Sequence, residues 1–198
     1  MVYSPNAKYI FVGRDARDVY WSWHNHHSNF TPATLEFINS LYPGEPDVGY
    51  PDPDVRIAFN HWLERDAYPN WPFWSHVQGW FDARHLPNLR LVHFADLKAD
   101  LEGEIKKLAA FLEIEVAPET WPAILEHCHI DYMRELAIRN ERMKTVFKGG
   151  GATFINKGTN GRWRDLLTPD DLAKFAAVVA QNLTPECARW LETGRLSD

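Results

Sequence analysis

Cysteine and long apolar runs are what this chain of 198 residues has least of. Its two cysteines, Cys128 and Cys187, lie far apart among ordinary helix-forming residues, which excludes a disulfide framework and fits a reducing cytosol. No apolar run approaches the roughly 18 residues of a membrane-spanning helix, and we find no signal peptide. We therefore expect a cytoplasmic protein that neither spans nor binds a membrane.

An excess of positive charge is also missing. The formal net charge is −6 at pH 7, whereas nucleic acid and anionic membranes both favour a basic surface. A local basic pocket for one small anion remains compatible with a net acidic chain. The sequence therefore predicts no nucleic-acid partner, and leaves a small anionic ligand open.

Signatures of metal and thiol chemistry are weak. His24 and His27 form an i,i+3 pair, but no carboxylate completes the pattern of a zinc enzyme, so we predict no metal site. Cys128 and His129 are adjacent in sequence, and adjacent residues of a helix point away from each other. A thiol nucleophile activated by that histidine is therefore excluded.

Strands and helices alternate along the chain, which is typical of an α/β protein with a parallel sheet. A length of 198 residues and a globular composition predict one domain over residues 1–198. Buried strands are predicted over Lys8–Val12 and Arg90–Phe94, and loops over Tyr42–Pro53 and Lys148–Gly151. Helices are predicted over Ala16–His27, Asp54–Arg65, Phe73–Arg84, Asp96–Leu112, Pro118–Cys128, Asp131–Asn140, Pro169–Asn182 and Pro185–Glu192.

The segment from Tyr9 to His27 carries the strongest functional signal. Its apolar run ends at a glycine, Arg14 follows at once, and Ser22 comes eight residues later in the predicted helix. A strand that turns into a helix N-terminus gathers backbone N–H groups around an anion, and arginine binds phosphate through two N–H donors. An ordinary βα unit, in which Arg14 pairs with Asp15 or Asp18, accounts for this segment equally well.

A second segment, Phe154–Arg164, is a basic loop punctuated by glycines. Together the two segments resemble the sulfotransferases that use 3′-phosphoadenosine-5′-phosphosulfate, PAPS. In that family a strand ends in an arginine, a serine follows eight residues later, and both bind the 3′-phosphate. A late loop, approximately Arg-Lys-Gly-x-x-Gly-x-Trp-Lys, closes over the same phosphate. The positions that match these two patterns are Arg14, Ser22, Lys157, Gly158, Gly161, Trp163 and Arg164.

Three positions depart from the family pattern. Asn156 replaces the arginine that opens the late loop, and Phe94 stands where the family often has a tyrosine. Ile130 replaces an aromatic residue that packs on adenine. The resemblance therefore implies a PAPS site with altered contacts to the cofactor.

The resemblance covers about the C-terminal two-thirds of the family. Its members open with a loop resembling Pro-Lys-Ser-Gly-Thr-Thr-Trp, which cradles the 5′-phosphosulfate, and a histidine base follows before the arginine strand. Neither element precedes Lys8, and no Gly-x-x-x-x-Gly-Lys-Ser/Thr motif occurs in the chain. The implied fold is a P-loop-type three-layer α/β fold, with a parallel sheet between helices that lacks its first strand.

The resemblance implies transfer of a sulfonate group from PAPS to a hydroxyl or amine of a small-molecule acceptor. The implied cofactor-binding residues are Arg14, Ser22, Lys157 and Gly158, with no catalytic residue inside the chain, so the isolated chain is expected to be inactive. The alternative is an inactive remnant that binds adenosine 3′,5′-bisphosphate or a partner chain. A second copy or a missing N-terminal segment is expected to pair with the first strand.

Overall fold

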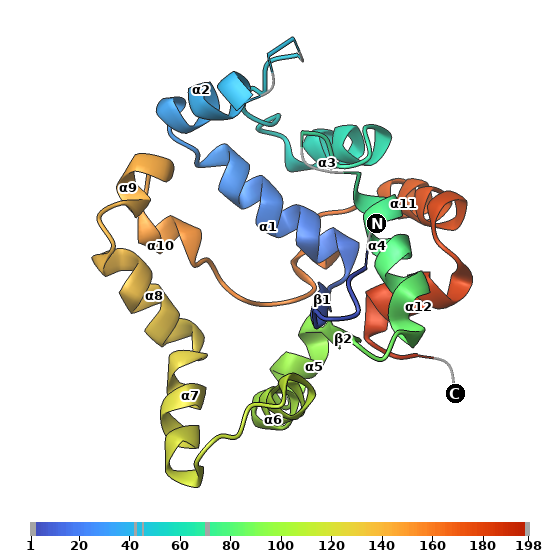
Figure 1. Cartoon of the computed structure of the whole chain (residues 1–198). Coiled ribbons are helices and arrows are strands. Elements are labelled where there is room, and N and C mark those ends of the chain that lie inside the picture. Colours follow the sequence, from blue (N-terminus) through green and yellow to red (C-terminus); the bar gives the residue numbers. More distant parts are fainter. Residues whose placement is uncertain (1–2, 42, 45, 70–71, 197–198) are drawn as a thin grey trace.

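A small parallel sheet lies near the middle of the structure, with helices on both sides (Figure 1). The computed structural model describes residues 3–41, 43–44, 46–69 and 72–196. Strands β1 (Tyr9–Gly13) and β2 (Leu89–His93) pair in parallel, from Tyr9 beside Leu89 to Gly13 beside His93. The predicted α/β class with parallel strands is therefore confirmed.

The helices follow most of the predicted ranges. Figure 1 shows α3, α4, α11 and α12 on one side of α1, and α7 to α10 on the other. The helices are α1 (Ala16–Ser28), α2 (Pro32–Leu41), α3 (Val55–Glu64), α4 (Phe73–Asp82), α5 (Phe94–Ala99), α6 (Leu101–Leu112), α7 (Trp121–His127), α8 (Ile130–Arg139), α9 (Met143–Val146), α10 (Gly151–Phe154), α11 (Pro169–Asn182) and α12 (Pro185–Thr193), with 3₁₀ turns at η1 (Ala83–His85), η2 (Pro118–Thr120) and η3 (Arg162–Asp165).

The prediction of two buried strands is wrong for β1. Ile10 and Val12 are 40% and 55% exposed, whereas Phe11 packs against His76 and Trp80 of α4. Side chains alternate between the two faces of a strand, so one face of β1 is covered by α4 and the other is not. Among the described residues β1 pairs with β2 alone, which leaves its outer edge without a strand neighbour.

The predicted helix Asp96–Leu112 is two helices. Its apolar spacing continues through residue 100, but Asp100 ends α5 and caps α6, because its carboxylate accepts a hydrogen bond from the N–H of Gly103 at 2.8 Å. An aspartate that can bond the backbone three residues later favours a helix start over a helix interior. Apolar periodicity alone could not detect this break.

Three helices lie where the sequence predicts none. Helix α2 is mostly exposed, and Leu35 is its only buried residue. It contacts the segment around α9. There the Thr31 hydroxyl donates to the Thr145 carbonyl at 2.7 Å, and the Thr31 N–H donates to Val146 at 2.9 Å. Gly151, predicted to end a loop, begins α10. The other two helices that the sequence did not predict, α9 and α10, have four residues each, too few to show a helical period.

Two residues of the predicted loop 42–53, Tyr42 and Glu45, lie outside the described residues.

The main core is aromatic and lies between α1, α3, α4, α11 and α12. Tyr20 and Phe59 are fully buried, and their rings meet at 5.0 Å between centroids. Trp62, Trp74 and Trp190 are each at most 3% exposed, so they serve the core, as aromatic residues commonly do. Within the described residues, no helix has the length and apolar character needed to cross a membrane.

Candidate functional site

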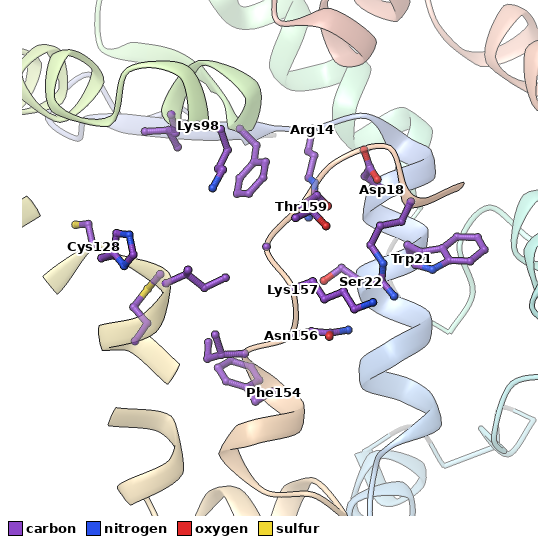
Figure 2. Close-up of a pocket in the computed structure, with 18 of the residues that line it drawn as sticks. Arg14, Asp18, Trp21, Ser22, Lys98, Cys128, Phe154, Asn156, Lys157 and Thr159 are labelled. Carbon is purple, nitrogen blue, oxygen red and sulfur yellow. The ribbon is translucent and has the colours of Figure 1, made fainter. Parts of the chain in front are cut away.

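A cavity of about 630 Å³ lies between α1, the segment 154–162, helix α5 and the start of α8 (Figure 2). Arg14, Ser22, Lys157 and Gly158 all line it, so the structure brings the four sequence-predicted residues together. They come from two segments more than 130 residues apart in the chain. Each segment reaches the cavity for its own structural reason.

Arg14 sits directly after β1 and is held by the late loop. Its Nε donates to the Oδ1 of Asn160 at 3.0 Å, and its Nη2 donates to the carbonyl oxygen of Thr159 at 3.0 Å. Its guanidinium lies 4.4 Å from the centre of the Phe94 ring. Burial lowers the pKa of Arg14, but an arginine stays charged at neutral pH because its usual pKa lies far above 7. The Phe94 ring thus supports the cation that faces the cavity.

The competing interpretation, in which Arg14 pairs with a neighbouring aspartate, is wrong. Among the described residues Asp15 pairs with Arg17 at 2.6 Å, and Arg14 has no ion pair. Asp18 instead accepts hydrogen bonds from the backbone N–H of Gly161, at 2.9 and 3.0 Å. Burial raises the pKa of Asp18, and the backbone N–H of Gly161 opposes this shift because it favours the carboxylate.

Arg17 fastens the far end of the late loop. Its guanidinium lies 3.8 Å from the centre of the Trp163 ring, and it also forms ion pairs with Asp15 and Glu192. Trp163 is consequently buried on α1 rather than lining the cavity. Asp18 and Arg17 therefore hold the loop against α1. Both belong to the Asp-x-x-Asp segment after Arg14, but sequence reasoning did not assign them this role.

Lys157 and Gly158 form the middle of the loop. Lys157 is exposed and has no hydrogen bond or ion pair among the described residues, and Figure 2 shows its side chain reaching towards α1, which carries Ser22. Gly158 has a φ of +62°, and a Cβ there would lie 2.2 Å from the Cδ1 of Ile130. Only glycine fits this backbone, because it alone adopts positive φ without strain and has no Cβ to clash. The glycine lets the loop approach α8 closely.

The same loop is tied to α8 by a residue that the sequence did not single out. Arg134 donates from Nη2 to the carbonyl oxygen of Asn156 at 2.8 Å, and its Nη1 pairs with Asp131 at 2.6 Å. Asn156, which replaces the arginine of the family pattern, thus accepts through its backbone carbonyl the hydrogen bond that ties the loop to α8. An arginine three residues after an aspartate on a helix is a common surface pair, so no sequence signal marks it.

The cavity has a basic side and an apolar side. Among the described residues, its cationic side chains are Arg14, Lys98, Lys157 and Arg162, against the carboxylate of Asp18. Sequence reasoning missed Lys98, an exposed lysine in the last turn of α5, and Arg162. The apolar lining comes mainly from Phe94, Leu97, Leu101, Ile130 and Met133. Such a cavity suits a ligand with an anionic end and a flat apolar part.

A second hollow, of about 270 Å³, adjoins this cavity. Arg14, just before α1, and Ser22 and His26 of α1 line both, so the two spaces meet along this side of α1. The rest of the second hollow is largely aromatic, with Trp23 and Trp62 on its wall.

Comparisons with known proteins give one consistent result. A family profile described as "Sulfotransferase domain" matches residues 1–185. The rat protein "Sulfotransferase 2A6" is 25% identical over 183 residues, which are 92% of this chain and 58% of the relative. "Glycolipid sulfotransferase" of Mycobacterium bovis is 25% identical over 224 residues, 98% of this chain and 67% of that protein. The chain thus spans about 58% of the length of the first relatives that it matches.

Solved structures agree in fold. The crystal structure of mouse sulfotransferase SULT7A1 complexed with PAP has a TM-score of 0.68 and 19% identity, covering 93% of this chain and 61% of that one. Retinol dehydratase in complex with androsterone and inactive cofactor PAP has a TM-score of 0.65 and 23% identity, covering 90% and 48%. These likenesses extend over nearly all of the present chain.

Proposed function

The chain belongs to the sulfotransferase family, and from this premise we propose that its large cavity binds the 3′-phosphate end of PAPS or of its product, adenosine 3′,5′-bisphosphate. One observation carries the proposal: Arg14 and Ser22 after β1, and Lys157 and Gly158 in the late loop, line a single cavity. Two cations, a hydroxyl and a close backbone are the groups that a phosphate dianion needs.

The residues present fit such a nucleotide. The cavity volume of about 630 Å³ lies within the range of small-molecule sites, and its wall has one cationic side and one apolar side. The backbone at Gly158 comes close to Ile130 only because no Cβ intervenes, which leaves a cradle that any other residue would fill. Ile130 and Phe94 offer apolar surface on which a purine ring can pack.

The roles of the chain's own residues follow from their contacts. Arg14 and Lys157 would hold the 3′-phosphate by charge, Ser22 by a neutral hydrogen bond, and Gly158 by its exposed backbone. The bonds from Arg14 to Thr159 and Asn160 fix the direction of the guanidinium, so little side-chain entropy is lost on binding. PAPS would bring the sulfonate group that is transferred. The chain described here would bind and orient this donor.

We also propose that the acceptor is a small molecule with a hydroxyl or an amine, seated in the second hollow. That hollow adjoins the nucleotide cavity at Arg14, Ser22 and His26, so an acceptor in it would lie beside the donor. Trp23 and Trp62 line it and offer flat apolar surface to an acceptor. The free thiols of Cys128 and Cys187 agree with a reducing compartment, and the cytoplasmic location stays a prediction.

The test of the nucleotide site compares three ligands of graded similarity. Adenosine 3′,5′-bisphosphate is expected to raise the melting temperature of the chain more than adenosine 5′-monophosphate, because only the first carries a 3′-phosphate. Differential scanning fluorimetry measures the shift, and adenosine 2′,5′-bisphosphate serves as a control of equal charge with one phosphate moved. Equal shifts for all three ligands would contradict the site.

The open edge of β1 leads to a proposal about assembly. We propose that a further strand pairs with β1, from a second copy of the chain or from a segment of a longer polypeptide. An unpaired apolar edge favours such pairing, since each orphaned backbone group that becomes buried costs about 1–3 kcal/mol. Val12 is 55% exposed there, whereas Phe11 faces the covered side, so Val12 is the position to alter.

The purified chain is accordingly expected to self-associate through β1, as measured by multi-angle light scattering. Val12→Lys should shift it towards monomer, because a charge on an edge strand opposes strand pairing. Phe37→Lys, at a residue of α2 that is 61% exposed, is the matched control and should leave the association unchanged. A stable, monodisperse wild-type monomer would be evidence against pairing with a second copy.

A further inference from the structure

A third hollow, of about 170 Å³, lies beyond Trp23 and Trp62. These two residues also line the second hollow, so the two spaces are neighbours at Trp23 and Trp62. The outer wall of the third hollow is the loop of residues 47–52, and its inner wall includes His27 of α1. None of Arg14, Ser22, Lys157 or Gly158 lines it, so it is distinct from the proposed nucleotide site.

His27 is the unusual residue of this hollow. It is only 4% exposed, and neither of its ring nitrogens has a hydrogen-bond partner of normal geometry among the described residues. Its ring packs edge-on against Trp23, with 4.6 Å between the ring centres, and lies 5.7 Å from Phe30. A buried polar group without a partner is unfavourable, so a molecule in the hollow that bonds to His27 would remove that penalty.

The charge state of His27 narrows the choice of partner. Burial lowers its pKa to about 4, and the backbone of Gly49 offsets this only in part, so the imidazole is neutral at pH 7. A neutral imidazole has one N–H donor and one acceptor nitrogen. A hydroxyl group both donates and accepts, and so it can pair with either nitrogen.

The walls of the hollow favour a flat apolar body. Tyr50 and Tyr68 line it together with the two tryptophans. Their hydroxyls already donate to carbonyl oxygens, Tyr50 to Phe30 at 2.9 Å and Tyr68 to Pro46 at 2.7 Å. Their hydroxyl protons are therefore engaged, and their rings are available for packing, since aromatic rings pack well against one another edge to face or offset.

An anionic ligand is less suited to this space. Asp47 and Asp52 line the hollow, against the single guanidinium of Arg65, which lies 4.0 Å from the centre of the Tyr68 ring. A carboxylate in the hollow would face two like charges, and it could use only the donor nitrogen of His27. The volume is close to the roughly 150 Å³ of a cavity known to hold benzene, so one ring fills it.

We propose that the third hollow is a binding site for a single aromatic ring that carries one hydroxyl group, with the hydroxyl hydrogen-bonded to His27 and the ring packed among Trp23, Tyr50, Trp62 and Tyr68. The site goes beyond the proposed function, because it requires neither a nucleotide nor the acceptor position beside Arg14. A phenol is the simplest ligand of this chemistry.

The probe is 4-fluorophenol, and fluorobenzene is its partner without the hydroxyl. In ¹⁹F NMR titrations of the wild-type chain, 4-fluorophenol is expected to bind at least tenfold more tightly than fluorobenzene, with or without adenosine 3′,5′-bisphosphate. His27→Phe keeps an aromatic ring and removes both nitrogens, so it should abolish this preference. His127→Phe is the matched control, because His127 is an exposed residue whose ring stacks on Tyr132. It should leave the preference intact.

A crystal structure of the wild-type chain with a bound phenol locates the ligand directly. This test needs no variant, so it remains decisive if His27→Phe does not fold. Crystals grown with 4-bromophenol should show a bromine anomalous peak inside the third hollow, with the hydroxyl within hydrogen-bond distance of a His27 nitrogen. Three results would overturn the proposal: equal affinities for 4-fluorophenol and fluorobenzene, a peak confined to another cavity, or a hollow that contains ordered water alone. None of these three results would contradict the proposed nucleotide site.

Discussion

Replacing Arg14 by alanine is expected to abolish the preference for adenosine 3′,5′-bisphosphate over adenosine 5′-monophosphate. Arg14 lines the cavity and its charge has no ion pair among the described residues, so a 3′-phosphate would be its counter-ion. A hydrogen bond to a charged group contributes about 1.5–3 kcal/mol, which corresponds to a loss of roughly 10- to 150-fold in affinity. Isothermal titration calorimetry of both nucleotides against wild type and variant measures the difference.

Two further variants distinguish the charge of Arg14 from its role in holding the late loop. Asn160→Ala removes one of the bonds that Arg14 makes to the loop but keeps the guanidinium, so most of the preference should survive. Arg139→Ala removes an exposed arginine that pairs with Glu135 on α8 at 3.2 Å, away from the cavity, and should change nothing. If Asn160→Ala lost as much affinity as Arg14→Ala, the arginine would act by holding the loop, and the direct contact to phosphate would be wrong.

A valine at position 158 is expected to weaken binding of adenosine 3′,5′-bisphosphate by a similar factor without removing any polar side chain. Gly158 has a φ of +62°, which is strained for a β-branched residue, and its Cβ would lie 2.2 Å from the Ile130 side chain. Such strain costs about 1–3 kcal/mol, so the loop should move away from α8 and the affinity should fall roughly 5- to 150-fold. Calorimetry at constant salt is the measurement.

The overlap and the backbone strain at this glycine can be told apart. Gly158→Ala combined with Ile130→Val removes the Cδ1 atom that the new Cβ would meet and keeps a branched apolar side chain for the purine, but leaves the positive φ, so only part of the affinity should return. Gly79→Ala is the control, because Gly79 lies in α4 and a Cβ there meets nothing within 4 Å. Unchanged affinity in Gly158→Val would mean that the close approach of the loop to α8 plays no part in binding.

Helix starts were the most predictable feature of the fold, because each is encoded within four residues. Thr168 and Asp171 form a reciprocal capping box at the start of α11, as the Thr-Pro-Asp-Asp sequence indicates. A local cap also explains why the prediction of one helix over Asp96–Leu112 was wrong. Asp100 caps α6 in the middle of an apolar pattern that continues on both sides of it. Helix α2 could not be predicted from its own residues, because its support comes from Thr145 and Val146, more than 100 residues away.

The sequence by itself determined the βα unit, the glycine loop and the residue types of the site, because period, turn and spacing are properties of neighbouring residues. Only the tertiary structure decided which partners those residues have. Arg14 lies one residue from Asp15 and four from Asp18 in the sequence, yet it bonds to Thr159 and Asn160. The aspartates are engaged elsewhere, by Arg17 and by the backbone of Gly161. A charged side chain takes the partner that folding brings within about 3 Å, and that distance depends on how the late loop packs against α1.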